Sequence, residues 1–435
     1  MLSPQPPALA SLRLAVEHPI LARCRGDGPC LPRRGQLVDI EDPRTIGARL
    51  RLIRDARKKS LRVVAGLAGM SKSKLSQIER GEIALDSISD IVALANALQI
   101  APSELMRLPV PAPANGETDS AVEAVRGALM AVGRDRPGGQ VVPLGALRAR
   151  VAAILGAHYS CRQDGEVGAV LPGLIRDLHT SIAAGRDVAE LLDLAVLLHT
   201  SATLGWLRLA GALLDLREQA ALLVHQAAQH RDTPAALGLA TWGGLHVMLS
   251  AGEFSLAQAE LDSVTVPTNS PESMQLAGML ALCRSFLAAA GGRPGDVSDP
   301  LDHAAELAEH TGQGNAYWMG FGPQETGQWR AAIALETGDY ERAAAIAEGL
   351  HPESHPLRGR QARYWVNYGQ ALARIRGRRD DAVVALLRAE KVSSRSVHRD
   401  PIAREVLAVL LTRARRDSPA GRELRRMAYR AGLPV

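Results

Sequence analysis

Three glycines, Gly252, Gly295 and Gly338, lie 43 residues apart, and Gly377 follows after a further 39 residues. A glycine can end a helix in the left-handed conformation, and a small residue shortly afterwards lets the next helix pack closely against the first. Helical hairpins of this kind cannot bury their apolar faces alone, so they stack into a solenoid with a concave inner surface. The spacing therefore predicts four to six stacked hairpins. An alanine lies five positions after three of the glycines, at Ala257, Ala343 and Ala382.

The composition favours helices throughout the chain. Aromatic residues make up only 3% of the 435 residues. No long alternation of β-branched or aromatic residues, which a sheet would need, is visible. The predicted fold class is all-α, and a chain of this length is expected to form two or three folding units.

Proline and glycine mark the expected domain boundaries. Residues 1–43 are rich in both without sustained periodicity, which predicts a disordered leader or a start assigned too far upstream. A proline-rich stretch at 109–117 would end any preceding helix and act as a spacer. The predicted organisation is a leader (1–43), a first module (44–108), a linker (109–120) and a helical-repeat domain (121–435).

Positive charge is concentrated in the first module. Residues 44–108 hold twelve Lys or Arg against six Asp or Glu, whereas the whole chain has a net charge of only +5. Four of the five lysines, Lys58, Lys59, Lys72 and Lys74, lie within 17 residues. Such local excess is expected of a module that contacts phosphates.

The same stretch, Ser60 to Gly81, contains two short helical patterns joined at Gly69, with cationic and amide side chains on the second helix. Ser60 and Ser71 stand where N-caps would start the two helices. Residues 45–108 resemble the XRE (lambda-repressor-like) family of five-helix DNA-binding domains. The residues that carry the resemblance are Ile46, Leu50, Ala65, Gly69-Met70-Ser71, Leu75, Ile78-Glu79-Arg80-Gly81, Ile91, Leu94, Ala95, Leu98 and Pro102 to Leu105.

The resemblance implies which residues contact double-stranded DNA. Lys72, Ser73 and Gln77 would reach base edges in the major groove, and Lys74 would lie closer to the backbone. One departure is Leu61, because the family commonly has a glutamine there that binds a phosphate. Arg62, Lys58 and Lys59 could take over that contact. The predicted DNA-binding residues are Lys58, Lys59, Arg62, Ser71, Lys72, Ser73, Lys74 and Gln77.

The family also implies an internal ion pair. Arg54 on the first helix should pair with Glu79, which would otherwise be an unusual acid on a DNA-facing element. A solvated charge couple without a structural role is the alternative.

Residues 121–435 resemble a tetratricopeptide-type solenoid with degenerate motifs. Trp365-x2-Tyr368-Gly369-x2-Leu372 is close to the first-helix signature, although Gly377 comes one residue late and Arg379 replaces the usual aromatic residue. The combination with the first module is similar to actinobacterial XRE regulators that carry helical-repeat sensor domains.

Aromatic residues of the repeat region are candidates for an effector-binding groove, because they supply contact area at little entropic cost. Packing in the repeat core is the alternative for each tryptophan, and helical histidines such as His199, His225 and His246 are more often structural. The segment Tyr317 to Pro323 is either a loop over a ligand or a helix start. The candidate ligand-binding residues are Trp242, His246, Trp318, Phe321, Tyr364, Asn367 and Tyr368.

No catalytic, metal-binding or cofactor-binding constellation is predicted. Cys24 and Cys30 lack the second pair of ligands that a zinc site needs. No signal segment or 18-residue apolar run is apparent, which predicts a cytoplasmic protein without a membrane span. The expected function is a non-enzymatic, homodimeric transcriptional regulator that senses a small molecule or peptide. A protein-interaction scaffold, whose helix-turn-helix only localises it or is weakened, is the alternative.

Overall fold

The computed structural model describes residues 45–107, 116–161, 164–414 and 418–435. Every regular element in these ranges is a helix, which confirms the all-α prediction. Residues 41–435 belong to one compact unit. The predicted leader, and Cys24 and Cys30 within it, lie outside the described residues.

Five short helices form the N-terminal module. Its core is built from apolar side chains that are almost fully buried, among them Ile46, Leu50, Leu75 and Ile78. Serine or threonine side chains cap the first four helices and so satisfy backbone amides that have no partner within the helix. The helices are α1 (Ile46–Ala56), α2 (Leu61–Leu67), α3 (Lys72–Glu79), α4 (Ile88–Leu98) and α5 (Pro102–Met106).

The rest of the described chain, here called the repeat region, consists of longer helices and a few short turns. They are α6 (Gly116–Val132), α7 (Leu144–Ser160), α8 (Asp164–Ala183), α9 (Val188–Leu197), η1 (Leu198–Thr203), α10 (Leu204–Leu209), α11 (Leu214–Arg231), α12 (Pro234–Ala251), α13 (Phe254–Ser263), α14 (Pro271–Ala290), η2 (Pro294–Asp296), α15 (Ser298–Thr311), η3 (Ala316–Trp318), α16 (Pro323–Glu336), α17 (Tyr340–Glu348), η4 (Pro352–Ser354), α18 (Arg358–Arg374), α19 (Arg379–Val392), α20 (Arg395–His398), α21 (Pro401–Arg413) and α22 (Pro419–Arg430).

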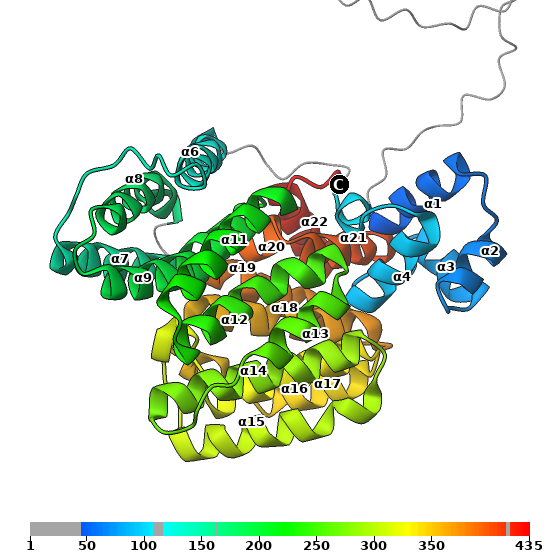
Figure 1. Cartoon of the computed structure of the whole chain (residues 1–435). Helices are drawn as coiled ribbons and strands as arrows, with labels where there is room; N and C mark the ends of the chain where they lie inside the picture. The colour runs from blue at the N-terminus through cyan, green and yellow to red at the C-terminus, as the bar shows by residue number, and fades with distance from the viewer. Residues whose placement is uncertain (1–44, 108–115, 162–163, 415–417) are drawn as a thin grey trace, which may run out of the picture. The chain divides into compact units, whose positions relative to one another are not determined.

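Four consecutive hairpins repeat along this region: α12 with α13, α14 with α15, α16 with α17, and α18 with α19. The first helices of these hairpins also pack on one another in order, so the hairpins form a stack (Figure 1). This arrangement fits the solenoid that the glycine spacing predicts. Ala257, Ala343 and Ala382, which follow three of the predicted turns, are at most 2% exposed, and this allows the paired helices to approach closely.

Three of the four predicted turn glycines have the expected backbone. Gly252, Gly338 and Gly377 have φ angles of 83°, 78° and 84°, each between the two helices of a hairpin. The prediction was wrong for Gly295, which lies in the short η2 turn. Gly292, with a φ of 68°, takes the left-handed position because the α14–α15 connection is longer and carries its own turn at Pro294.

The predicted linker is shorter than the sequence indicates. Its residues 109–115 lie outside the described chain, but α6 already begins at Gly116. Glu117 and Asp119 lie in the first turn of α6, where negative charge is favourable at the positive end of a helix.

Among the described residues, two apolar segments are long enough to cross a membrane by length and composition alone. They are Val188–Leu209 and Pro271–Ala290, and 61% and 72% of their most apolar windows are buried inside the protein. Core helices of a soluble protein give the same signal, so these segments are weak evidence for membrane insertion.

The N-terminal module packs on the repeat region through two carboxylates, the buried Glu405 and the half-buried Glu336. Glu405 of α21 accepts hydrogen bonds from the amides of Ile46, at 2.6 Å, and Leu85, at 3.3 Å. Glu336 at the end of α16 accepts from the amides of Ile88, at 3.0 Å, and Ser89, at 2.7 Å. Glu405 thus binds the first amide of α1, and Glu336 binds the first two amides of α4, both from outside the module.

Candidate nucleic-acid interface

The second and third helices are positioned by their caps and by one glycine. The Ser60 hydroxyl accepts from the Val63 amide, and the Ser71 hydroxyl accepts from the Lys74 amide at 3.1 Å. Between the two helices, Gly69 has a φ of 67°, a left-handed conformation that glycine adopts without steric cost. The predicted caps and the turn glycine are therefore confirmed.

Helix α3 has one face in the module core and one in solvent. Leu75, Ile78 and Glu79 are buried. Lys72 and Ser73 are exposed and Gln77 is half-buried, so these three side chains lie away from the core. A helix with a buried apolar side and an outward polar side can enter a major groove without unfolding the module.

The other predicted contacts divide into two groups. Lys58, Arg62 and Ser71 are exposed. Lys59 donates to the carbonyl of Ala97 at 2.7 Å, and Lys74 lies 2.7 Å from a carboxylate oxygen of Asp90. The ammonium groups of Lys59 and Lys74 thus already have partners within the protein, whereas Lys58, Arg62 and Ser71 face solvent.

Arg54 and Glu79 form the predicted ion pair. Two guanidinium nitrogens of Arg54 donate to the two carboxylate oxygens of Glu79 at 2.6 and 2.8 Å. The hydrogen bond to Glu79 is also the main reason why the pKa of Arg54 is raised. Both residues are less than 10% exposed, so the pair belongs to the module interior and is not a solvated couple.

Comparison with known proteins identifies this module. A family model described as "Helix-turn-helix domain" matches residues 45–108. Residues 45–108 form a helix-turn-helix domain. No curated protein and no solved structure matches the chain.

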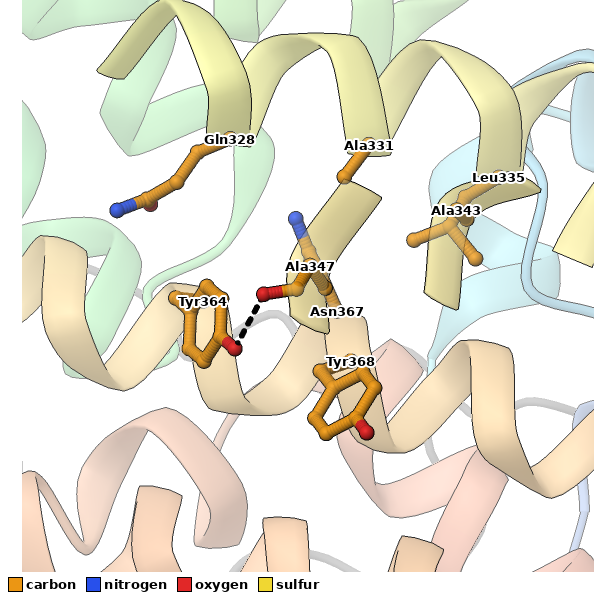
Figure 2. Close-up of a pocket in the computed structure, with 8 residues that line it drawn as sticks. All are labelled: Gln328, Ala331, Leu335, Ala343, Ala347, Tyr364, Asn367 and Tyr368. Atoms are coloured by element: carbon orange, nitrogen blue, oxygen red, sulfur yellow. Dashed lines mark hydrogen bonds between the residues drawn. The ribbon is translucent and has the colours of Figure 1, made fainter. Parts of the chain in front are cut away.

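The predicted ligand-binding residues do not form one site. Tyr364, Asn367 and Tyr368 line a cavity of about 10 Å³ beside α16 and α17, which has room for at most one water molecule (Figure 2). The Tyr364 hydroxyl donates to the Ala347 carbonyl at 2.8 Å, and the Tyr368 hydroxyl donates to Glu348. These two tyrosines thus hold α17 against α18.

The remaining candidates lie on other elements. Trp242 is 7% exposed on α12, and His246, one turn later, is exposed. Phe321 is fully buried. Trp318 stacks on Tyr159 with ring centroids 5.8 Å apart, and Tyr317 and Trp318 both have left-handed backbones. Tyr317 and Trp318 belong to the short η3 turn, and α16 begins at Pro323, so the helix start with Pro in its first turn is confirmed. Whether this segment covers a ligand stays a prediction.

Sequence reasoning missed the polar residues that join the domain to the repeat region. Besides Glu336 and Glu405, Arg374 donates to the Ala84 carbonyl at 2.8 Å, and Gln370 donates to the Asp86 carbonyl. Burial raises the pKa of Glu405 to about 7 and that of Asp86 to about 6. No local motif marks these residues, because most of their partners are backbone groups distant in the sequence.

Proposed function

We propose that the protein is a sequence-specific transcriptional regulator that binds double-stranded DNA through α3. The observation that carries the proposal is the outward face of α3, where Lys72, Ser73 and Gln77 are free of the core while Leu75 and Ile78 anchor the helix. Lysine suits guanine O6 and N7, and glutamine suits adenine, in the major groove.

The proposal includes a homodimer and an effector. One recognition helix reads about half of a site, so useful affinity generally needs two copies spaced by a turn of DNA. The repeat region, which resembles tetratricopeptide solenoids, would supply the dimer contact and bind a small molecule or peptide. The protein would act in the cytoplasm and without catalysis.

The test is genome-wide DNA capture with the full-length protein, followed by affinity measurements on the best site at two salt concentrations. Lys72→Ala and Gln77→Ala should each weaken binding by about 1–3 kcal/mol at that site. Arg51→Ala is a matched control, because Arg51 is an exposed cation on α1 outside the recognition helix. Binding that is equal for all sequences and falls steeply with salt would contradict base readout.

A second candidate function is a protein-interaction scaffold. The internal partners of Lys59 and Lys74 favour it, because they reduce the charge available to phosphates. Recovery of a stable heteromeric complex from cells, together with only nonspecific DNA binding, would support the scaffold. Specific binding by the isolated protein would exclude it.

A further inference from the structure

A cavity of about 170 Å³ lies where the helix-turn-helix domain meets the repeat region. Its walls come from the α3–α4 connection, from the end of α18 and the start of α19, and from α21. An apolar cavity of about 150 Å³ in another protein binds benzene, so this volume suits a ligand built on one ring of that size.

The cavity lining has an unbalanced charge. Four arginines, Arg374, Arg376, Arg379 and Arg413, line it together with only two acids, Glu82 and Asp86. Arg374 lies 3.6 Å from a carboxylate oxygen of Asp86, and Arg413 lies 3.9 Å from one of Glu82. The two carboxylates thus already have cationic neighbours, and the lining keeps an excess of positive charge.

Arg376 and Arg379 supply that excess. Both side chains are exposed, and within the described residues neither makes a hydrogen bond or an ion pair. The neighbouring Arg378 differs, because it is paired with Asp381 and Glu348. Two unpaired guanidinium groups at one cavity are suited to a carboxylate or another oxyanion, which they can bind through charge-assisted hydrogen bonds.

Asp86 adds a second requirement for the ligand. The side chain of Asp86 is only 4% exposed, and its Oδ2 is buried without a hydrogen-bond partner. An unpaired buried acceptor is costly, and a ligand hydroxyl or amino group would satisfy it. Apolar side chains such as Ile375, Val406 and Val409 complete the lining and suit a hydrocarbon body.

We propose that this cavity binds a small organic acid that carries a hydroxyl or amino group, with its carboxylate on Arg376 and Arg379 and its donor on Asp86. Because the walls belong to both the helix-turn-helix domain and the repeat region, the bound acid stabilises the docked arrangement of the two. The prediction that the bound acid changes the affinity for DNA rests on the proposed function. The prediction that the acid binds does not rest on it.

The test uses the full-length protein without DNA and 3-hydroxybenzoate as the probe in titration calorimetry. Benzoate lacks the donor, 3-hydroxybenzyl alcohol lacks the charge, and inorganic phosphate supplies a different oxyanion. We expect 3-hydroxybenzoate to bind most tightly, and each missing group to weaken binding by about tenfold or more. Binding of phosphate without binding of the organic acid would overturn the assignment to a carboxylic acid.

Two variants locate the site. The double variant Arg376→Gln, Arg379→Gln should lose affinity by about tenfold or more, and its folding can be checked by thermal unfolding because both side chains are exposed. Arg148→Gln, an exposed arginine on α7 outside the cavity, should bind like the wild type. The proposal is refuted if the double variant binds 3-hydroxybenzoate as tightly as the wild type. It is also refuted if the wild type does not bind 3-hydroxybenzoate at 10 mM, which is roughly the weak limit of affinity for a ligand of this size.

DNA affinity with and without 3-hydroxybenzoate separates this proposal from the proposed function. If the acid binds and DNA does not, the cavity assignment stands and the DNA-binding proposal fails. If DNA binds specifically and the acid does not, the reverse holds. A wild-type response of DNA affinity that disappears in the double variant would support both.

Discussion

The Arg54–Glu79 pair shows how a single interaction sets the direction of α3. Glu79 ends α3 and Arg54 lies on α1, so their two short hydrogen bonds fix the angle between these helices. Arg54 also donates to the carbonyl of Lys59, which leads into α2. One guanidinium group thus connects the first three helices.

Replacement of Arg54 by alanine should destabilise the protein by about 3–5 kcal/mol, because it leaves the buried Glu79 carboxylate without a compensating charge. Urea unfolding followed by circular dichroism measures the change. Asp55→Ala is the control, since Asp55 is an exposed partner of the same arginine and should cost about 0.5 kcal/mol or less. A similar loss in both variants would show that the pair has no special role.

This pair could be predicted from the sequence because it depends on residues at fixed positions within one short module. The exposure of Lys72 and Ser73 follows in the same way, since Leu75 and Ile78 determine which side of α3 is buried. The internal partners of Lys59 and Lys74 could not be predicted, because Ala97 contributes only a carbonyl and Asp90 looks like any helix-capping acid.

At the scale of elements, α1 and α3 are in very close contact. A Cβ atom added at Gly47 on α1 would lie 1.9 Å from the carbonyl oxygen of Ile78 on α3. Backbone atoms cannot move as a flexible side chain can, so any side chain at residue 47 must separate the two helices.

Gly47→Ala should therefore lower stability by about 1–3 kcal/mol or more, through overpacking between α1 and α3. Gly66→Ala on α2 is a matched control, because nothing lies within 4 Å of its added Cβ. Alanine there should stabilise the protein by up to about 1 kcal/mol through helix propensity. Thermal unfolding of both variants measures the two changes in stability. A loss of stability in Gly66→Ala as large as that in Gly47→Ala would contradict the packing argument.

The hairpin glycines show what the sequence can and cannot specify at this scale. Gly252, Gly338 and Gly377 were found because a short turn requires a left-handed residue at one position. The spacing gave a wrong turn residue at Gly295, because a regular interval between glycines does not show how many residues a particular connection contains. Connection length depends on how the two helices pack, which no local pattern records.

At the scale of the whole molecule, the helix-turn-helix domain and the repeat region are joined through the carboxylates of Glu336 and Glu405. The sequence predicted both parts but not their contact. Glu336 and Glu405 resemble ordinary acids on helices, and the groups that they bind are mostly amides with no sequence signature. The cavity beside this contact was missed for the same reason.

Glu405 should make this contact sensitive to pH. Burial raises its native pKa to about 7, from a value of 4.5 in the unfolded chain. Between these values the native state binds more protons than the unfolded state, so the Glu405 contribution to stability falls as the pH rises. Over this window the loss is on the order of 3 kcal/mol.

The measurement is the free energy of unfolding of wild type and Glu405→Gln at pH 5 and pH 8. The wild type should lose stability relative to the variant between these values, because glutamine does not titrate. Glu423→Gln, which changes a partly exposed acid on α22, should follow the wild type. Parallel profiles for Glu405→Gln and wild type would refute the effect.

The position of Glu405 in the chain has a consequence for synthesis. Its partner Ile46 precedes it by 359 residues. At typical rates of translation, the ribosome adds Glu405 on the order of tens of seconds after Ile46. During that time the helix-turn-helix domain has left the ribosome, but the carboxylate that covers the start of α1 does not yet exist. A newly made chain therefore has helix α3 before it has the surface on which the domain docks.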